Sequence, residues 1–236
     1  MAFFNTSFKR RVTVEYLSAL VAGLGAGSLY AVIGVLMVIM STLTRVVNFS
    51  QVGVGVYAAF LSIRLGTALA PLGLPKELTT LICVIFAIVV GAAVSALIGL
   101  IIARWLPSSS TTARSAVTVA GMLFLISLSL LQFGPLSQPL MPLVVGPLFS
   151  FDVVTVTKIS VLMLGLALAI WALAHVVLNK TPIGIRLRAI ADRPTAAELL
   201  GVNVKALQVG VWAATGGLMT LAIMIGGNNL ASQATV

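Results

Sequence analysis

Charged residues are scarce in this chain of 236 residues. Only 8% of the residues are charged, 60% are hydrophobic, and the mean hydropathy is +1.16. A soluble domain carries about 25% charged residues, because it must cover its surface with solvated groups. Most of the surface of this chain must therefore face lipid, and the composition excludes an ordinary soluble domain.

Cysteine and histidine each occur once. Cys83 lies inside an apolar run, so it can form no intramolecular disulfide and we interpret it as a small buried hydrophobe. His175 lies near the end of another apolar run, where a lone histidine favours an interfacial position over a catalytic or proton-relay role. The sequence predicts no catalytic constellation, no metal site and no cofactor, so we do not expect an enzyme.

Acidic residues are absent from the interior of the apolar runs. The acidic residues are Glu15, Glu77, Asp152, Asp192 and Glu198, and all of them fall at the ends of the runs or between them. Intramembrane carboxylates are typical of proton- or sodium-coupled transport, so their absence disfavours a secondary transporter and a membrane hydrolase with a carboxylate pair. The G-x-x-x-x-G-K-[ST] pattern is also absent, which excludes ATP binding by a P-loop on this chain.

The net charge of +9 would suggest nucleic acid as a partner for a soluble protein. Here the lysines and arginines lie between the apolar runs, and no basic patch is interleaved with aromatic residues. This distribution favours a role in membrane topology, following the excess of positive charge on cytoplasmic loops. We expect this chain to lie in the lipid bilayer and to have no nucleic-acid partner.

Long apolar runs are what the sequence has in abundance. A membrane-spanning helix needs about 20 apolar residues, and backbone groups in hydrocarbon must bond within their own segment. The sequence predicts an all-α fold: a polytopic transmembrane helix bundle of about six hydrophobic segments, with residues 1–236 forming a single domain. The segments are Tyr16–Met40, Val46–Leu65, Thr79–Ala103, Ala116–Phe133, Lys158–Leu178 and Leu207–Ile225.

The loops predict the sides of the membrane. The loop 179–206 holds five basic residues, Lys180, Arg186, Arg188, Arg193 and Lys205, which predicts a cytoplasmic position. The Pro-rich loop 134–157 has no lysine or arginine, which predicts an external position. The basic N-terminal segment 1–15 also favours the cytoplasm, but five crossings would place it outside, so its orientation stays open. A segment that does not cross would resolve this conflict.

Residues 46–65 are the segment for which we expect a break or a re-entrant path. Gly53 and Gly55 would suit such a helix, and the segment begins with the polar stretch Asn48-Phe49-Ser50-Gln51. Polar side chains at membrane depth are costly unless they face other helices or a water-filled path. Two alternatives follow for Asn48–Gln51: they line a translocation path, or they form hydrogen bonds between helices.

The loop 179–206 also carries a pattern of its own. Pro182 and Gly184 are expected to end the preceding helix, while Asp192 can cap a short helix with Pro194 in its first turn and Gly201 at its end. Helical spacing places three apolar residues on one face, namely Ala196, Leu199 and Leu200. This amphipathic helix outside the membrane needs a partner, either the bilayer surface or a groove on another protein.

Three ordered motifs resemble a known family. Gly184–Asp192, followed by Ala196-Ala197 and Leu200–Asn203, resembles the cytoplasmic loop of permease subunits in bacterial branched-chain amino acid ABC importers. Gly25–Ala31 and Asn48–Gln51 fall in the order and spacing of that family, and the resemblance spans roughly residues 20–227. The chain departs from the family in having Val52 directly after Gln51. Members usually continue for about two more helices, so the resemblance implies a chain that is short at its C-terminal end.

The resemblance implies a permease subunit of an ATP-driven importer of branched-chain amino acids in the inner membrane. The implied partners are a second permease subunit, cytoplasmic ATP-binding subunits and a periplasmic substrate-binding protein. The loop would couple to the ATPase through Gly184, Arg188, Ala189, Asp192, Ala197, Glu198, Leu199 and Gly201. The alternatives are a sugar permease of the same superfamily, an ATP-independent carrier or channel, and a non-transport scaffold or fragment.

Overall fold

The computed structural model describes residues 2–107, 109–134, 144, 146–151 and 154–233. This part of the chain contains six helices long and apolar enough to cross a membrane, which confirms the predicted polytopic helix bundle. These helices are α1 (Ala2–Thr44), α2 (Ser50–Leu69), α3 (Lys76–Trp105), α4 (Thr111–Phe133), α5 (Lys158–Lys180) and α8 (Val204–Gln233). The shorter elements are η1 (Ala70–Leu72), α6 (Pro182–Asp192), α7 (Pro194–Leu199), β1 (Pro147–Phe151) and β2 (Val154–Thr157).

Local sequence explains where several of these helices begin and end. The Ser110 hydroxyl accepts a hydrogen bond from the amide of Ala113 and caps α4, and Thr157 caps α5 by accepting from the amide of Ser160. Gly134 follows the last residue of α4 with a φ of +79°, a conformation that glycine adopts without a steric penalty. Such caps satisfy backbone groups that a helix leaves unpaired at its ends.

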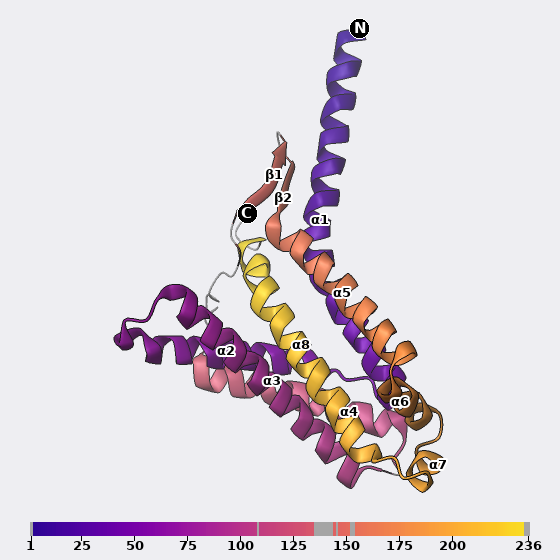
Figure 1. Cartoon of the computed structure of the whole chain (residues 1–236). Coiled ribbons are helices and arrows are strands. Elements are labelled where there is room, and N and C mark those ends of the chain that lie inside the picture. The colour runs from indigo at the N-terminus through magenta and orange to yellow at the C-terminus, as the bar shows by residue number, and fades with distance from the viewer. Residues whose placement is uncertain (1, 108, 135–143, 145, 152–153, 234–236) are drawn as a thin grey trace.

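Helix α8 lies at the centre of the bundle. The span of α8 is 61% buried, whereas the other spans are 17–39% buried. It packs between α1 and α5 on one side and α2 and α3 on the other (Figure 1). The main apolar core joins these five helices through residues that include Leu36, Ala59, Ala87, Met163, Met219 and Ala222.

Helices α3 and α8 approach each other closely because small residues line their contact. A Cβ at Gly216 would lie 2.2 Å from the Cβ of Ser95, and a Cβ at Gly99 would lie 2.4 Å from the ring of Trp212. The Ser95 hydroxyl donates a hydrogen bond of 2.7 Å to the carbonyl of Trp212. Small residues that let backbones approach are typical of helix contacts in lipid.

Helix α2 is continuous, and the expected break at Gly53 and Gly55 is not found. A Cβ at Gly55 would lie 2.5 Å from the Cδ1 of Ile223, so this glycine makes room for α8 rather than interrupting α2. The chain leaves the helical path just before α2 instead, over residues 45–49. Arg45 there has a φ of +55° and is the one non-glycine residue with positive φ in the described part of the chain.

The bundle has two distinct ends. Helices α6 and α7 lie together at one end, which we call the α6–α7 end, whereas the β1–β2 hairpin and the N-terminal half of α1 lie at the other (Figure 1). Six helices that alternate in direction account for this arrangement. Each of the five described spans before the loop 179–206 is long enough to cross, so the N-terminus and this loop lie at opposite ends of the bundle and the conflict raised by the basic residues 9–11 remains.

A two-stranded hairpin was not predicted for the Pro-rich loop. Strands β1 and β2 pair antiparallel, with Phe149 opposite Val156 and Phe151 opposite Val154. β-branched and aromatic residues favour such a pairing, and this segment is rich in them. Residues 135–143, 145 and 152–153 of the loop lie outside the described residues, and its external position stays a prediction.

Candidate functional site

The residues between α1 and α2 bring buried polar groups into the bundle. We call residues 46–51 the polar turn. Asn48, Ser50 and Gln51 are 1%, 0% and 2% exposed, whereas Phe49 is 40% exposed and lies at the surface. Of the four residues proposed for the translocation path, the structure therefore buries three together and places the fourth outside them.

Helix α4 holds the backbone of the polar turn. The amide of Val47 donates to the hydroxyl of Ser115 at 3.3 Å, and the amide of Phe49 donates to the hydroxyl of Thr118 at 3.1 Å. The Thr118 hydroxyl also lies 3.1 Å from the carbonyl of Val47, to which it can donate. These side chains supply partners to a buried backbone that has no helical ones.

The side-chain amides of the polar turn are only partly paired. The Ser50 hydroxyl donates to Oδ1 of Asn48 at 2.7 Å, and Nε2 of Gln51 donates to the carbonyl of Thr215 in α8 at 3.2 Å. Asn48 Nδ2 and Gln51 Oε1 are buried without a partner in the described part of the chain. Hydrogen bonds between helices are thus present, and a donor and an acceptor remain for water or a polar solute, since unpaired buried groups are costly.

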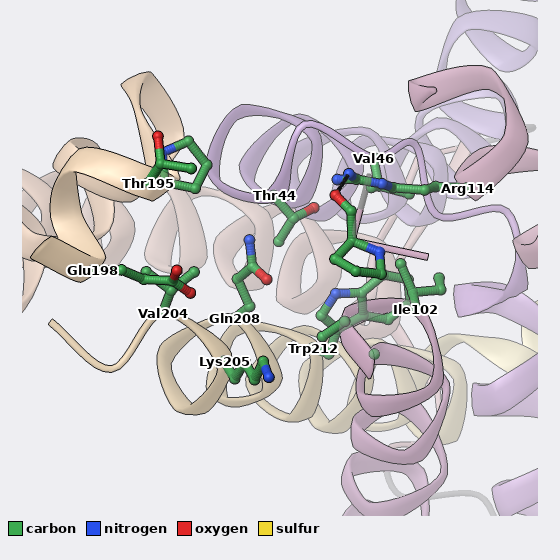
Figure 2. A pocket seen from close by; sticks show the side chains of 14 residues that line it. Thr44, Val46, Ile102, Arg114, Thr195, Glu198, Val204, Lys205, Gln208 and Trp212 are labelled. Atoms are coloured by element: carbon green, nitrogen blue, oxygen red, sulfur yellow. Dashed lines mark hydrogen bonds between the residues drawn. The ribbon is translucent and has the colours of Figure 1, made fainter. Parts of the chain in front are cut away.

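A cavity of about 180 Å³ lies between the polar turn and α7. Val46 of the polar turn lines it together with the ends of α1 and α3 and the starts of α4 and α8, and Figure 2 shows Gln208 pointing toward Thr44 across it. The Arg114 guanidinium lines one side, where it donates to the carbonyls of Leu106 and Pro107. The lining is therefore mostly apolar with polar groups from Thr44, Arg114 and Gln208, and the cavity lies against α7.

The preceding helix, α5, ends at Lys180, just before Pro182, as predicted, but a further helix, α6, that was not predicted begins at once. Pro182 is the first residue of α6, and the Thr181 hydroxyl caps it by accepting from the amide of Gly184 at 3.2 Å. Proline is well suited to a first helical position because its missing N–H needs no partner there. A Cβ at Gly184 would lie 2.3 Å from the carbonyl oxygen of Val177, so glycine lets α6 fold back against the end of α5.

Helix α7 partly matches the predicted amphipathic helix. Pro194 lies in its first turn as predicted, and Gly201, with a φ of +81°, donates its amide to the carbonyl of Glu198 at 2.9 Å and ends it. The predicted cap is wrong, because Asp192 is the last residue of α6 and Arg193 precedes α7 without a side-chain hydrogen bond. A new helix, α6, occupies the sequence that was expected to be a loop.

The two faces of α7 differ sharply. Ala197 is 2% exposed and packs with Ile190 of α6 and Val204 of α8. Leu199 and Leu200 are 90% and 83% exposed. The stripe predicted from the sequence therefore points away from the bundle, while Ala197 attaches α7 to it.

The remaining residues proposed for coupling lie at the surface of the same end. Arg188, Ala189 and Glu198 are exposed, and Nη1 of Arg188 donates to Oδ1 of Asn179 at 3.3 Å. The Asp192 carboxylate lies 3.7 Å from the Arg45 guanidinium. The sequence alone predicted no function for Arg45, although Arg45 is the first charged residue after a long uncharged segment.

His175 lies near the end of α5, and its interfacial position stays a prediction. It is exposed on α5, its ring stacks on Trp171 with 5.8 Å between the ring centroids, and Nδ2 of Asn179 lies 3.2 Å from its Nδ1. Within the described residues, no three His, Cys, Asp or Glu side chains gather where they could hold a metal ion.

Comparison with known proteins agrees with the architecture of the bundle. Residues 19–232 match the family described as the branched-chain amino acid transport system, permease component. No curated protein and no solved structure matches the chain. The match covers the spanning helices, the polar turn and the α6–α7 end, and the chain is a multi-pass transport protein of the membrane that belongs to this permease family.

Proposed function

We propose that this chain is the permease subunit of an ATP-driven importer of branched-chain, hydrophobic amino acids in the inner membrane. In this proposal it forms part of the translocation path with a second permease subunit, and separate cytoplasmic ATPase subunits supply the energy. A periplasmic binding protein delivers the substrate. The family match supports the class of substrate, and the geometry of α6 and α7 supports the route by which energy enters.

The exposed pair Leu199–Leu200 is the observation that carries the proposal. Two leucines that are 90% and 83% exposed beyond the spanning helices do not contribute to the stability of this chain alone. Glu198 beside them adds a charge that suits a protein partner better than the lipid interior. Burying both leucines in a groove of an ATPase subunit would remove apolar surface from water and drive docking.

Helix α7 is also attached firmly enough to transmit movement. Its one buried residue, Ala197, packs against Ile190 and Val204, so a displacement of α7 displaces α6 and the start of α8. Alternating access needs an element whose two positions favour outward- and inward-open bundles differently. In the proposed mechanism the ATPase dimer moves α7, and α8 carries the movement to the centre of the bundle.

The polar turn gives the path its polar groups. Asn48 Nδ2 and Gln51 Oε1 can bind water or the polar backbone groups of an amino acid when the bundle opens. The absence of carboxylates from the described span interiors suits a neutral, zwitterionic solute delivered by a binding protein.

The test replaces Glu198 and Leu199 in a complex reconstituted in liposomes with its second permease, ATPase subunits and binding protein. The E198A/L199S variant is expected to lose substrate-stimulated ATP hydrolysis by about tenfold or more, because an apolar anchor residue contributes on the order of 1–2 kcal/mol to an interface. Leucine uptake and ATP hydrolysis are both measured.

The matched control is Leu72→Ser. Leu72 is 66% exposed on η1 at the opposite end of α2, so this change removes a similar exposed leucine away from α7. We expect L72S to keep normal stimulation. Normal stimulation in the E198A/L199S variant would overturn the proposal, and counterflow of leucine by the purified chain alone would favour an ATP-independent carrier.

A further inference from the structure

Arg45 joins the end of α1 to the end of α6. Its backbone amide donates to the carbonyl of Ser41 at 3.0 Å, which completes the last turn of α1. Its Nε donates to the carbonyl of Ala191 at 3.0 Å, and its Nη2 lies 3.7 Å from Oδ1 of Asp192. One side chain therefore connects helix ends that are 146 residues apart in the sequence.

Electrostatics explain why a cation suits this point. The carboxyl end of a helix carries a partial negative charge and unpaired carbonyl groups. The ends of α1 and α6 meet here, and the Asp192 carboxylate adds a full negative charge to the end of α6. The Arg45 guanidinium contacts the end of α6 and offsets part of this charge, although the side chains of the ion pair are 65% and 79% exposed and water screens their attraction.

The backbone of Arg45 is strained in a way that indicates a constrained position. A φ of +55° is unfavourable for a residue with a side chain and is adopted readily only by glycine. The strain persists because Arg45 turns the chain from α1 into the polar turn while its side chain reaches α6. Directly after it, Val46 packs with Leu43 of α1 and Leu187 of α6 in one buried cluster.

We infer that Arg45 is a coupling residue that transmits movement of α6 and α7 directly to the polar turn. The route runs from Ala197 of α7 to Ile190 of α6, from the end of α6 to Arg45, and from Arg45 to Asn48 and Gln51 through the adjoining backbone. This route does not pass through α8, although α8 packs against the same clusters through Val204, Val211 and Trp212. The inference rests on the proposed function only for the ATPase subunits that would move α7. The contacts that join α6, Arg45 and the polar turn lie within this chain.

The first experiment uses hydrogen exchange on the full chain in lipid nanodiscs without ATPase subunits. Arg45→Gln removes both contacts to α6 and Asp192→Asn removes the ion pair alone. We expect the amides of Val47 and Phe49 to exchange about three- to fivefold faster in R45Q and less so in D192N. The effect is modest because one hydrogen bond and one exposed ion pair each stabilise the folded state only weakly. The last turn of α6 is expected to change in parallel.

The double variant R45Q/D192N tests whether the two residues act through each other. Coupled residues give non-additive effects, so the double variant should exchange no faster than R45Q. Arg186→Gln is the matched control, because it removes the same charge from an exposed position on α6. Amides in the α3–α8 contact should keep wild-type protection, which shows that the bundle remains folded.

The second experiment measures transport in the reconstituted complex. R45Q is expected to retain binding of the ATPase subunits and to lose about threefold or more in leucine transported per ATP hydrolysed, since docking is intact and transmission is weakened. Unchanged exchange at Val47 and Phe49 in both single variants, or an unchanged transport ratio, would overturn the inference. A complex that never assembles would refute the proposed function, while the exchange experiment still decides the role of Arg45.

Discussion

At the scale of single residues, burial of polar groups is the feature that most needs an explanation. In a membrane protein of this composition, alanine or leucine would be the ordinary residue at the buried positions of Asn48, Ser50 and Gln51. Each of these side chains is at most 2% exposed, yet Asn48 Nδ2 and Gln51 Oε1 have no partner in the described part of the chain. Unpaired buried groups are rare in native proteins, and they occur where function requires them.

Gln51→Leu separates a packing role from a role in the path. The change removes the unpaired Oε1 and the hydrogen bond to Thr215, whose carbonyl lies within the helical hydrogen-bond pattern of α8. We expect the free energy of unfolding to change by only about 1 kcal/mol or less, because an apolar residue replaces a partly paired amide. Leucine uptake in the reconstituted complex is expected to fall by about tenfold or more.

Ser62→Ala is the control for this prediction. Ser62 is also buried in α2, but its hydroxyl donates to the carbonyl of Ala59 in its own helix and lies 3.6 Å from the sulfur of Met224, so both properties should change little. Thermal unfolding in detergent reports stability and radiolabelled leucine reports uptake. Uptake by Q51L equal to that of S62A would show that Gln51 serves packing alone.

At the scale of elements, the joint between α5 and α6 decides where α7 is held. The chain leaves the helical path at Thr181, and the backbone of α6 passes so close to the end of α5 that Gly184 has no room for a Cβ. Figure 1 shows α6 against the ends of α1 and α5. Because α7 follows directly on α6, this close contact helps to set the direction of the exposed leucines, together with the packing of Ala197.

Gly184→Ala is expected to displace α6 and to weaken coupling. A Cβ 2.3 Å from a backbone oxygen cannot be accommodated by a side-chain rotation, so we expect a cost of about 1–3 kcal/mol that is relieved by moving α6. Substrate-stimulated ATP hydrolysis should fall while membrane insertion remains normal. Gly210→Ala in α8, where a Cβ would meet nothing within 4 Å, should leave both unchanged. Equal activity of the two variants would contradict the proposed role of the joint.

At the scale of the whole molecule, the alternation of six helices gives the bundle its polarity. The α6–α7 end collects the start of α2, the end of α3 and the start of α4, which the polar turn and the cavity bring together. The β1–β2 hairpin lies at the opposite end (Figure 1), and η1 follows the end of α2 that is remote from the polar turn. This polarity places the proposed contact with an ATPase at one end only.

Cysteine labelling in intact cells tests this arrangement. In a Cys83→Ala background, Leu199→Cys at the α6–α7 end and Leu72→Cys at the other end are both highly exposed. A membrane-impermeant maleimide added outside should label L72C in spheroplasts and L199C only in inverted vesicles, since positive charge favours a cytoplasmic α6–α7 end. Labelling of both from one side would contradict the arrangement of the bundle.

The class of fold and most helix limits followed from sequence because they depend on local properties. The six spans were recognised by apolar length, and their ends in the structure lie close to those predicted for α3, α4 and α5. The exposed leucines of α7 and its end at Gly201 were likewise predicted, because helical spacing and a left-handed glycine are local signals. The motif at Asn48–Gln51 indicated the polar residues of the polar turn. The motif in the loop 179–206 indicated the permease family.

Only the tertiary structure decided how these parts are connected. Pro182 and Gly184 predicted the end of α5 but not the start of α6, which depends on the close packing of Gly184 against the end of α5. The contact of Arg45 with Ala191 and Asp192, and the two unpaired amide groups of the polar turn, arise between residues far apart in the sequence. The scarcity of charge determined that the chain lies in lipid; packing of helix ends decided which of its few charges meet.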